Sequence, residues 1–90
     1  MKVKVRYLSW GIARSFGSSN KVETIHLSGK AKYQDVLDIL DEKVKHHGKK
    51  DEELLDTFVL LCDGRVIHRV KDEAVSPDCN ILVGYADFGG

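Results

Sequence analysis

The chain has 90 residues, of which 42% are hydrophobic and 31% are charged, and its formal net charge at pH 7 is zero. This is the composition of one ordinary globular domain, and the balanced charge disfavours nucleic-acid binding. No apolar run reaches membrane-spanning length and the N-terminus lacks the apolar core of a signal peptide, so we expect a cytoplasmic protein that does not cross a membrane.

The charges are unevenly distributed along the chain. Residues 1–32 carry seven Lys or Arg and one Glu, whereas residues 51–90 carry three Lys or Arg and nine Asp or Glu. The acidic part either steers the chain's end toward a basic groove of a partner or is ordinary solvated surface.

Two strands and a loop are predicted at the N-terminus. Apolar and charged residues alternate over residues 2–7 and again over 21–27, which predicts two half-buried strands. Residues 9–20 between them hold two glycines and four serines. We interpret this segment as a long irregular loop of a hairpin, and we expect its Trp10 to pack on the domain.

One amphipathic helix is predicted over residues 33–45. Its apolar residues recur at helical spacing and form a single stripe: Tyr33, Val36, Leu37, Leu40 and Val44. Acidic residues precede basic ones along it, as the helix dipole favours, and Gly48 is the expected stop. Lys32 stands where an N-capping Ser or Thr would be expected.

Three short strands are predicted in the second half. After a charged connector at 49–56, the continuous apolar run 57–62 predicts a strand buried on both faces. Asp63-Gly64 predicts a hairpin turn into a return strand at Val66-Ile67. A last strand is expected at 80–83.

Gly84 is expected to loosen the last strand into a tail. The predicted order is therefore two strands, one helix and three strands. Because one helix with one apolar stripe covers one face of one sheet, the other face is expected to be open.

The sequence shows no motif for independent catalysis or metal binding. Its four histidines form no ligand pattern, and neither a P-loop nor a hydrolase motif is present. Cys62 and Cys79 are isolated and are expected to be small buried hydrophobes, with a disulfide or metal role as the less favoured alternative. We therefore expect a protein that is not an enzyme.

The sequence ends in Gly89-Gly90. Glycine has no side chain and bends freely, so such an end can thread a narrow channel toward an enzyme that activates its carboxylate. The alternative is a frayed tail without function.

In this order and spacing, the motifs resemble the MoaD/ThiS sulfur-carrier branch of the β-grasp, ubiquitin-like proteins, with the archaeal small modifiers and the ubiquitin-related modifier. The resemblance spans the chain and rests on residues 3–8, 35–40, 61–65, 78–83 and 89–90. It implies an α+β fold with a mixed sheet packed on one helix. It also implies a β-grasp domain at residues 1–86 and a flexible tail at 87–90.

The resemblance implies that the chain is a carrier and substrate. An ATP-dependent, E1-like enzyme would join the Gly90 carboxylate to AMP, and a sulfur donor protein would convert it to a thiocarboxylate for molybdopterin, thiamin or tRNA thiolation. ATP and Mg²⁺ would belong to that partner, so no cofactor or metal is expected on this chain.

Three alternatives share these features. The chain could be a ubiquitin-like modifier joined to lysines of target proteins, the small subunit of a two-subunit sulfur-transferring synthase, or a plain β-grasp interaction module. A set of residues is assigned to partner binding, in the tail and on the open sheet face: Phe88, Tyr85, Leu8, Phe58, Leu60 and Leu82. The tail departs from the branch at Tyr85-Ala86, where two prolines are usual, and at Phe88, where a small or polar residue is usual.

Overall fold

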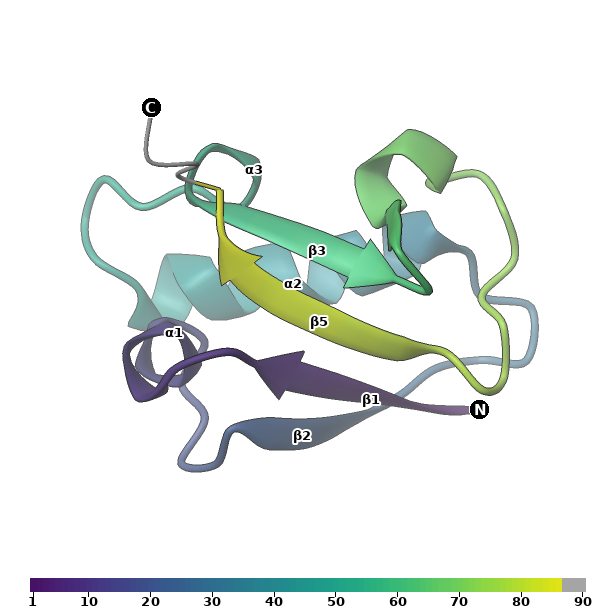
Figure 1. Ribbon diagram of the computed structural model, residues 1–90, viewed down its shortest axis with the longest axis horizontal. Coiled ribbons are helices and arrows are strands. Elements are labelled where there is room, and N and C mark those ends of the chain that lie inside the picture. The colour runs from purple at the N-terminus through teal and green to yellow at the C-terminus, as the bar shows by residue number, and fades with distance from the viewer. Residues whose placement is uncertain (87–90) are drawn as a thin grey trace.

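The computed structural model describes residues 1–86, which form five strands, three α-helices and one 3₁₀ helix (Figure 1). In chain order these are β1 (Lys2–Tyr7), α1 (Trp10–Ser15), β2 (Val22–His26), α2 (Tyr33–His47), α3 (Leu54–Thr57), β3 (Phe58–Cys62), β4 (Arg65–Val66), η1 (Ile67–Val70) and β5 (Asn80–Tyr85). The predicted order of strands and main helix is confirmed, and the short helices are additional.

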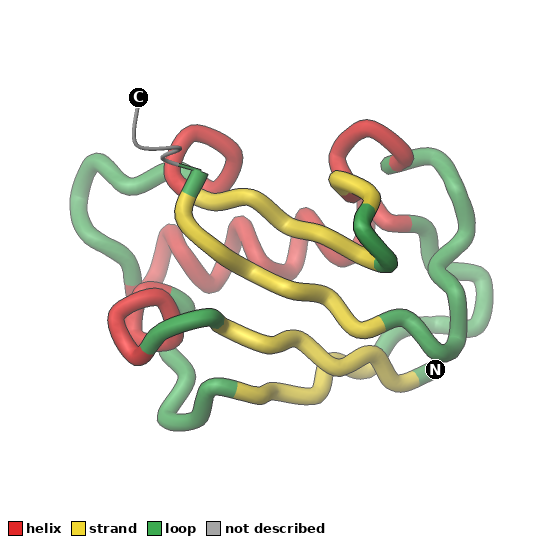
Figure 2. Tube along the Cα trace, viewed as in Figure 1, coloured by secondary structure: helices red, strands yellow, loops and turns green. Residues whose placement is uncertain are grey.

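The strands form one mixed sheet in the order β2-β1-β5-β3-β4. The central strands β1 and β5 are parallel, and every other neighbouring pair is antiparallel. Helix α2 connects β2 to β3 and crosses behind the sheet (Figure 2). This is the mixed sheet on one main helix that the sequence predicts.

Helix α2 forms where its apolar stripe predicts it and ends at His47, immediately before Gly48. All five residues of the stripe are buried: Tyr33, Val36, Leu37, Leu40 and Val44. The missing Ser or Thr cap is replaced by a residue inside the helix, because the Asp35 carboxylate accepts the Lys32 N–H at 2.8 Å. An acidic group in the first turn also complements the helix dipole.

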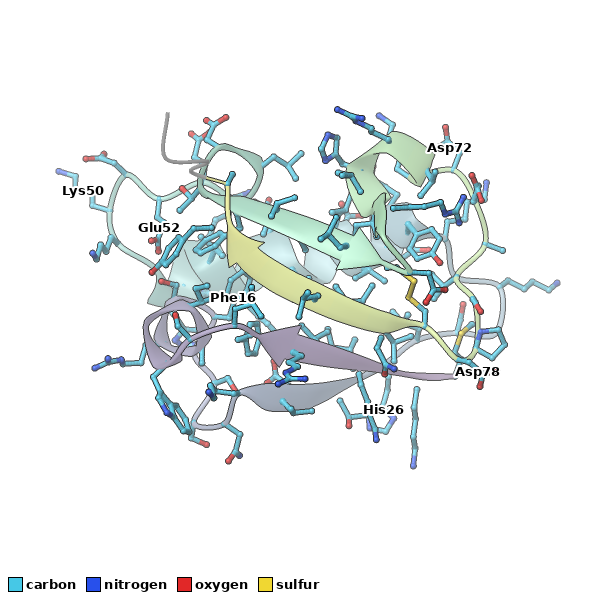
Figure 3. The ribbon with its side chains drawn as sticks, viewed as in Figure 1. Phe16, His26, Lys50, Glu52, Asp72 and Asp78 are labelled. Carbon is cyan, nitrogen blue, oxygen red and sulfur yellow. A yellow bond between two sulfur atoms is a disulfide. The ribbon has the colours of Figure 1, made fainter. Side chains whose placement is uncertain are left out.

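The segment predicted as an irregular loop contains helix α1, so that prediction is wrong. Ser9 caps the helix, since its Oγ accepts the Ile12 N–H at 3.2 Å. Phe16 follows the helix and is buried, with its ring centroid 5.0 Å from that of Tyr7 and 4.9 Å from that of Phe58. Figure 3 labels Phe16 among the side chains at this end of the sheet. The buried ring of Phe16 therefore holds this serine-rich segment against the domain.

The core lies between α2 and the face of the sheet that this helix covers. Side chains of β1, β3 and β5 fill it from the sheet. Tyr7 is fully buried, and its hydroxyl donates a hydrogen bond of 2.6 Å to Glu23, which lies 3.5 Å from Lys43 Nζ. Burial and, second, this bond to the carboxylate raise the pKa of Tyr7 well above its usual value. The polar end of Tyr7 is thus satisfied inside the domain.

The second half differs from prediction in three places. Strand β3 alternates between buried and half-buried residues rather than being buried on both faces. The predicted connector ends in α3, and Ile67 begins η1 instead of continuing the return strand. Gly84 lies within β5 and pairs with Val59, so it does not loosen the strand.

The Asp63-Gly64 turn joins β3 to β4 as predicted. Both residues have positive φ, 52° and 79°, and Cys62 pairs with Arg65 across the turn. This two-residue turn with positive φ twice is the type that a hairpin favours.

The two cysteines are buried as predicted, but they form a disulfide rather than standing as isolated thiols. The Cys62–Cys79 bond joins the end of β3 to the residue before β5 and is visible as a yellow bond in Figure 3. The Tyr33 hydroxyl donates to Cys62 Sγ at 3.5 Å. Spacing alone did not reveal the pairing, because Cys79 reaches Cys62 only once β5 has paired with β3.

Reduction of this disulfide is expected to lower the free energy of unfolding by about 3 kcal/mol. The bond joins residues 17 positions apart, and closing a loop of this size restricts the unfolded chain by about that amount. Urea unfolding with and without a phosphine reductant measures the difference. The Cys62→Ala/Cys79→Ala variant is the control, since its unfolding should not respond to reductant. An unchanged midpoint for the parent chain would contradict the prediction.

Candidate functional site

The carboxyl end of β5 brings the chain's last described residues to one end of the sheet, beside α3 (Figure 1). The Ala86 N–H donates to the Thr57 carbonyl at 2.9 Å, which extends the pairing of β5 with β3 by one residue. Gly89, Gly90 and Phe88, predicted as the activated end and its neighbour, lie outside the described residues. Gly90 is five residues beyond Tyr85 in the sequence.

Tyr85 stands at the base of this end and is half exposed. Its ring stacks on Phe58, with the centroids 5.7 Å apart and the planes at 22°. One face of Tyr85 therefore packs on the domain, while the rest remains available to a partner. A cavity of about 350 Å³ beside Tyr85 is lined by three basic side chains, Arg14, His47 and Lys49.

The face of the sheet away from α2 carries an apolar strip beside this end. Five side chains of β3, β4, β5 and the residue after β1 make it up, and we call them the open-face patch: Leu8, Val59, Leu61, Val66 and Leu82. The strand register places them together, because Leu61 pairs with both Leu82 and Val66. Their alternation out of the core leaves them exposed or half-buried.

Gly84 lets the two ends of this patch meet across β5. A Cβ on Gly84 would lie 2.9 Å from Leu8 Cδ1 and 3.9 Å from Val59 Cγ1. The Leu8 side chain therefore occupies the space that any other residue at position 84 would fill. Leu8 itself is 53% exposed.

Two residues that we assigned to partner binding are in the core instead. Phe58 and Leu60 are 2% and 1% exposed and point toward α2. Val59 lies between these two residues and Leu61 follows them, and both point to the open face. A continuous apolar run does not show which residues face which side, and the missing signal was the pairing of the run with β5, where Leu61 lies opposite Leu82.

Basic residues border the open-face patch on one side. Lys2, Lys4 and Arg6 alternate with the core residues of β1, and all three are exposed. Arg6 pairs with Leu82 and Lys4 with Asn80 in the neighbouring strand. A partner that covers the patch therefore meets positive charge along β1, which favours an acidic rim on that partner.

Trp10, which we expected to pack on the domain, is more than half exposed. It is 54% exposed, and Lys21 Nζ lies 5.7 Å from its ring centroid. This distance is within the range of a cation–π contact at an exposed site.

The described part of the chain offers no evident metal site and no candidate membrane span. Residues 1–86 contain no group of three His, Cys, Asp or Glu side chains placed to share a metal ion. None of the helices between residues 1 and 86 has the length and apolar character that spanning a bilayer requires.

Comparisons with known proteins identify the fold. No protein-family model matches the chain, and no curated protein matches it in sequence. Among solved structures, SAMP1 from Haloferax volcanii is 20% identical, with all of both chains covered and a TM-score of 0.65. A putative molybdopterin converting factor, subunit 1, from Pyrococcus furiosus is also 20% identical, with 92% of this chain and 94% of that one covered and a TM-score of 0.67.

A second structure, of the small archaeal modifier protein 1 of H. volcanii, is 20% identical over 91% of this chain and 93% of that one, with a TM-score of 0.59. At this identity the likeness concerns the fold. The resemblance expected from the sequence is confirmed at that level: residues 1–86 have the β-grasp, ubiquitin-like fold of these proteins.

Proposed function

We propose that this protein is a sulfur carrier whose C-terminal Gly90 is activated by a separate ATP-dependent, E1-like enzyme. The observation that carries the proposal is the position of β5. This central strand brings the last described residues to the end of the sheet, where Leu8 of the open-face patch lies over Gly84. Five more residues lead to Gly90. A partner seated on the patch could therefore receive the terminus in its own active site.

In the proposed reaction the Gly90 carboxylate attacks the α-phosphorus of ATP, and pyrophosphate leaves. The outer sulfur of a donor protein's persulfide then attacks the acyl carbon and AMP leaves. A second thiol of the donor cleaves the resulting acyl disulfide, which leaves a C-terminal thiocarboxylate on this chain and a disulfide on the donor. A free carboxylate is a poor acyl donor at neutral pH, so the first step is needed before sulfur can enter. The phosphates and Mg²⁺ would be held by the partner, and this chain would contribute the acyl group and its docking surface rather than catalysis.

The solved structures support a carrier of this kind. One of them is named as a molybdopterin converting factor subunit and covers nearly the whole chain. The same name supports the variant in which this chain works as the small subunit of a larger synthase. Stable copurification with a larger subunit would distinguish that variant.

The second candidate function is that of a ubiquitin-like protein modifier. Two of the similar structures are small archaeal modifier proteins, and activation by adenylation would be common to both functions. The difference lies in the nucleophile: a lysine amine of a target protein in place of a sulfur donor would give an isopeptide bond to Gly90.

Mass spectrometry of the protein from its native host tests the proposal and separates the two functions. For a carrier, we expect the intact mass of a chain that ends at Gly90. We also expect a fraction of the molecules in which one sulfur atom replaces one oxygen atom. Gly-Gly remnants on lysines of other proteins would favour the modifier. If neither form exists and deletion of Gly89 and Gly90 leaves function intact, the chain is a plain interaction module.

A further inference from the structure

A second surface lies on the side of the domain away from the open-face patch. It is a groove of about 390 Å³. It runs over α2 between α3 and η1, which stand apart above β3 in Figure 1. Neither the proposed activation of Gly90 nor the open-face patch uses this groove.

The floor of the groove is apolar and one of its walls is acidic. Leu37 and Leu54 are 5% and 4% exposed, while Leu55 is 49% exposed at the rim. A half-exposed leucine over buried ones gives a partner an apolar contact that is already in place. The acidic wall is formed by Asp38 and Glu53, together with a third carboxylate, Asp41.

The carboxylates differ in what they already bind. Asp41 lies 3.0 Å from Lys45 Nζ, and Asp38 accepts the neutral Gln34 amide at 2.8 Å. Among the ion pairs within residues 1–86, none includes Asp38 or Glu53. Two negative charges therefore remain uncompensated by an ion pair next to the apolar floor.

The groove also has basic side chains. His68 belongs to η1 and Lys71 directly follows it, and the Lys71 carbonyl accepts the Gln34 N–H at the start of α2. Along α2, Gln34 is about one helical turn, or about 6 Å, from Asp38 and about two turns, or about 10 Å, from Asp41. The three carboxylates of the groove outnumber these two basic side chains, so its charge favours a ligand that carries a cation.

We propose that this groove binds a short peptide segment of a partner protein in which a Lys or Arg neighbours an aliphatic residue. The aliphatic side chain covers Leu54 and Leu55, and the cation lies between Asp38 and Glu53. Charge complementarity selects this occupant, since an acidic segment would meet the two unpaired carboxylates. The groove is on the α2 side and the open-face patch is on the other, so both can be occupied in one complex.

A titration of the full chain with three synthetic peptides tests this proposal. The peptides share one leucine and differ at its neighbouring residue, which is Lys, Gln or Glu. Backbone amide NMR shifts report where each peptide binds and how tightly. We expect the Lys peptide to shift the amides of α3 and of residues 34–41, and to bind about tenfold more tightly than the Gln peptide. Its affinity should fall with added salt.

Variants of exposed groove residues localise the effect. The double variant Asp38→Asn/Glu53→Gln is expected to weaken the Lys peptide about tenfold and to leave the Gln peptide within about twofold. Glu42→Gln is the matched control, because Glu42 is an exposed carboxylate of α2 that lies near His46 and outside the groove. It should change neither affinity. Unchanged amide spectra away from each substitution show that the variants are folded.

Three results would overturn the proposal. One is equal affinity for the three peptides, and another is no shift of the groove amides at millimolar Lys peptide. The third is self-association, in which Lys2, Lys4 and Arg6 of β1 on a second copy would occupy the groove in place of a peptide. In that case groove and β1 amides would shift together as the chain is concentrated without peptide.

Discussion

Replacing Leu8 with aspartate is expected to lower kcat/KM for adenylation by the activating enzyme about 100-fold. Leu8 is half exposed and lies over Gly84 in the open-face patch, which we propose as the docking surface. A carboxylate buried there without a partner would weaken the complex by about 3 kcal/mol, which corresponds to about 100-fold. ATP–pyrophosphate exchange at increasing concentrations of the variant measures the change, and most of it should appear in KM.

Trp10→Asp is the matched control for this experiment. Trp10 is 54% exposed and Leu8 is 53% exposed, but Trp10 lies in α1 and outside the open-face patch. Both variants should keep the free energy of unfolding within about 1 kcal/mol of the parent, because exposed positions tolerate substitution. Equal losses of exchange for the two variants would show that the patch has no special role.

The parts of the fold that repeat a pattern over many residues were predictable from the sequence. Helix α2 shows its apolar stripe over three turns, and β1 alternates over six residues with its charged residues outside. Local turn chemistry was equally informative at Asp63-Gly64, whose two positive φ angles require residues of this kind. In each case the signal is contained in neighbouring residues.

The parts that depend on long-range contacts were not predictable. Helix α1 has only six residues and is stabilised by the burial of Ile12, Ala13 and the following Phe16 against the sheet. Taken alone, this short sequence is typical of a loop, because it is too short for a stable isolated helix and has a glycine and two serines in and beside it. The Cys62–Cys79 bond likewise depends on the pairing of β3 with β5, which no local pattern specifies.

The predictions for the candidate site were likewise right where a local pattern exists and wrong where it does not. Leu8 and Leu82 were assigned to the open face and do lie there, because each continues an alternation that begins in its own strand. Phe58 and Leu60 were assigned to the wrong face, because the run 58–62 is apolar throughout and its alternation appears only in the burial of the folded strand. Tyr85 combines both roles: it stacks on Phe58 and remains half exposed.

Replacing Gly90 with alanine is expected to reduce adenylation by at least about 1000-fold. In the proposed reaction the terminal carboxylate must approach the α-phosphorus of ATP inside the partner's channel, and a methyl group at Gly90 would displace it from that position. Displacements of about 1 Å can lower a rate 100-fold, and restricting the backbone freedom of glycine adds to the loss. ATP–pyrophosphate exchange with saturating protein measures kcat, in which the effect should appear.

Two comparisons make this prediction decisive. Asp87→Ala changes the tail without altering Gly89-Gly90, and it should keep the exchange rate within about threefold of the parent. Gly90→Ala should also unfold at the same urea concentration as the parent, because terminal residues of a domain seldom contribute to its stability. If Gly90→Ala raised KM and left kcat unchanged, the tail would contribute only to docking, as Leu8 is proposed to do. A parental exchange rate for Gly90→Ala would refute activation at this carboxylate, and the open-face patch would then serve a partner of another kind.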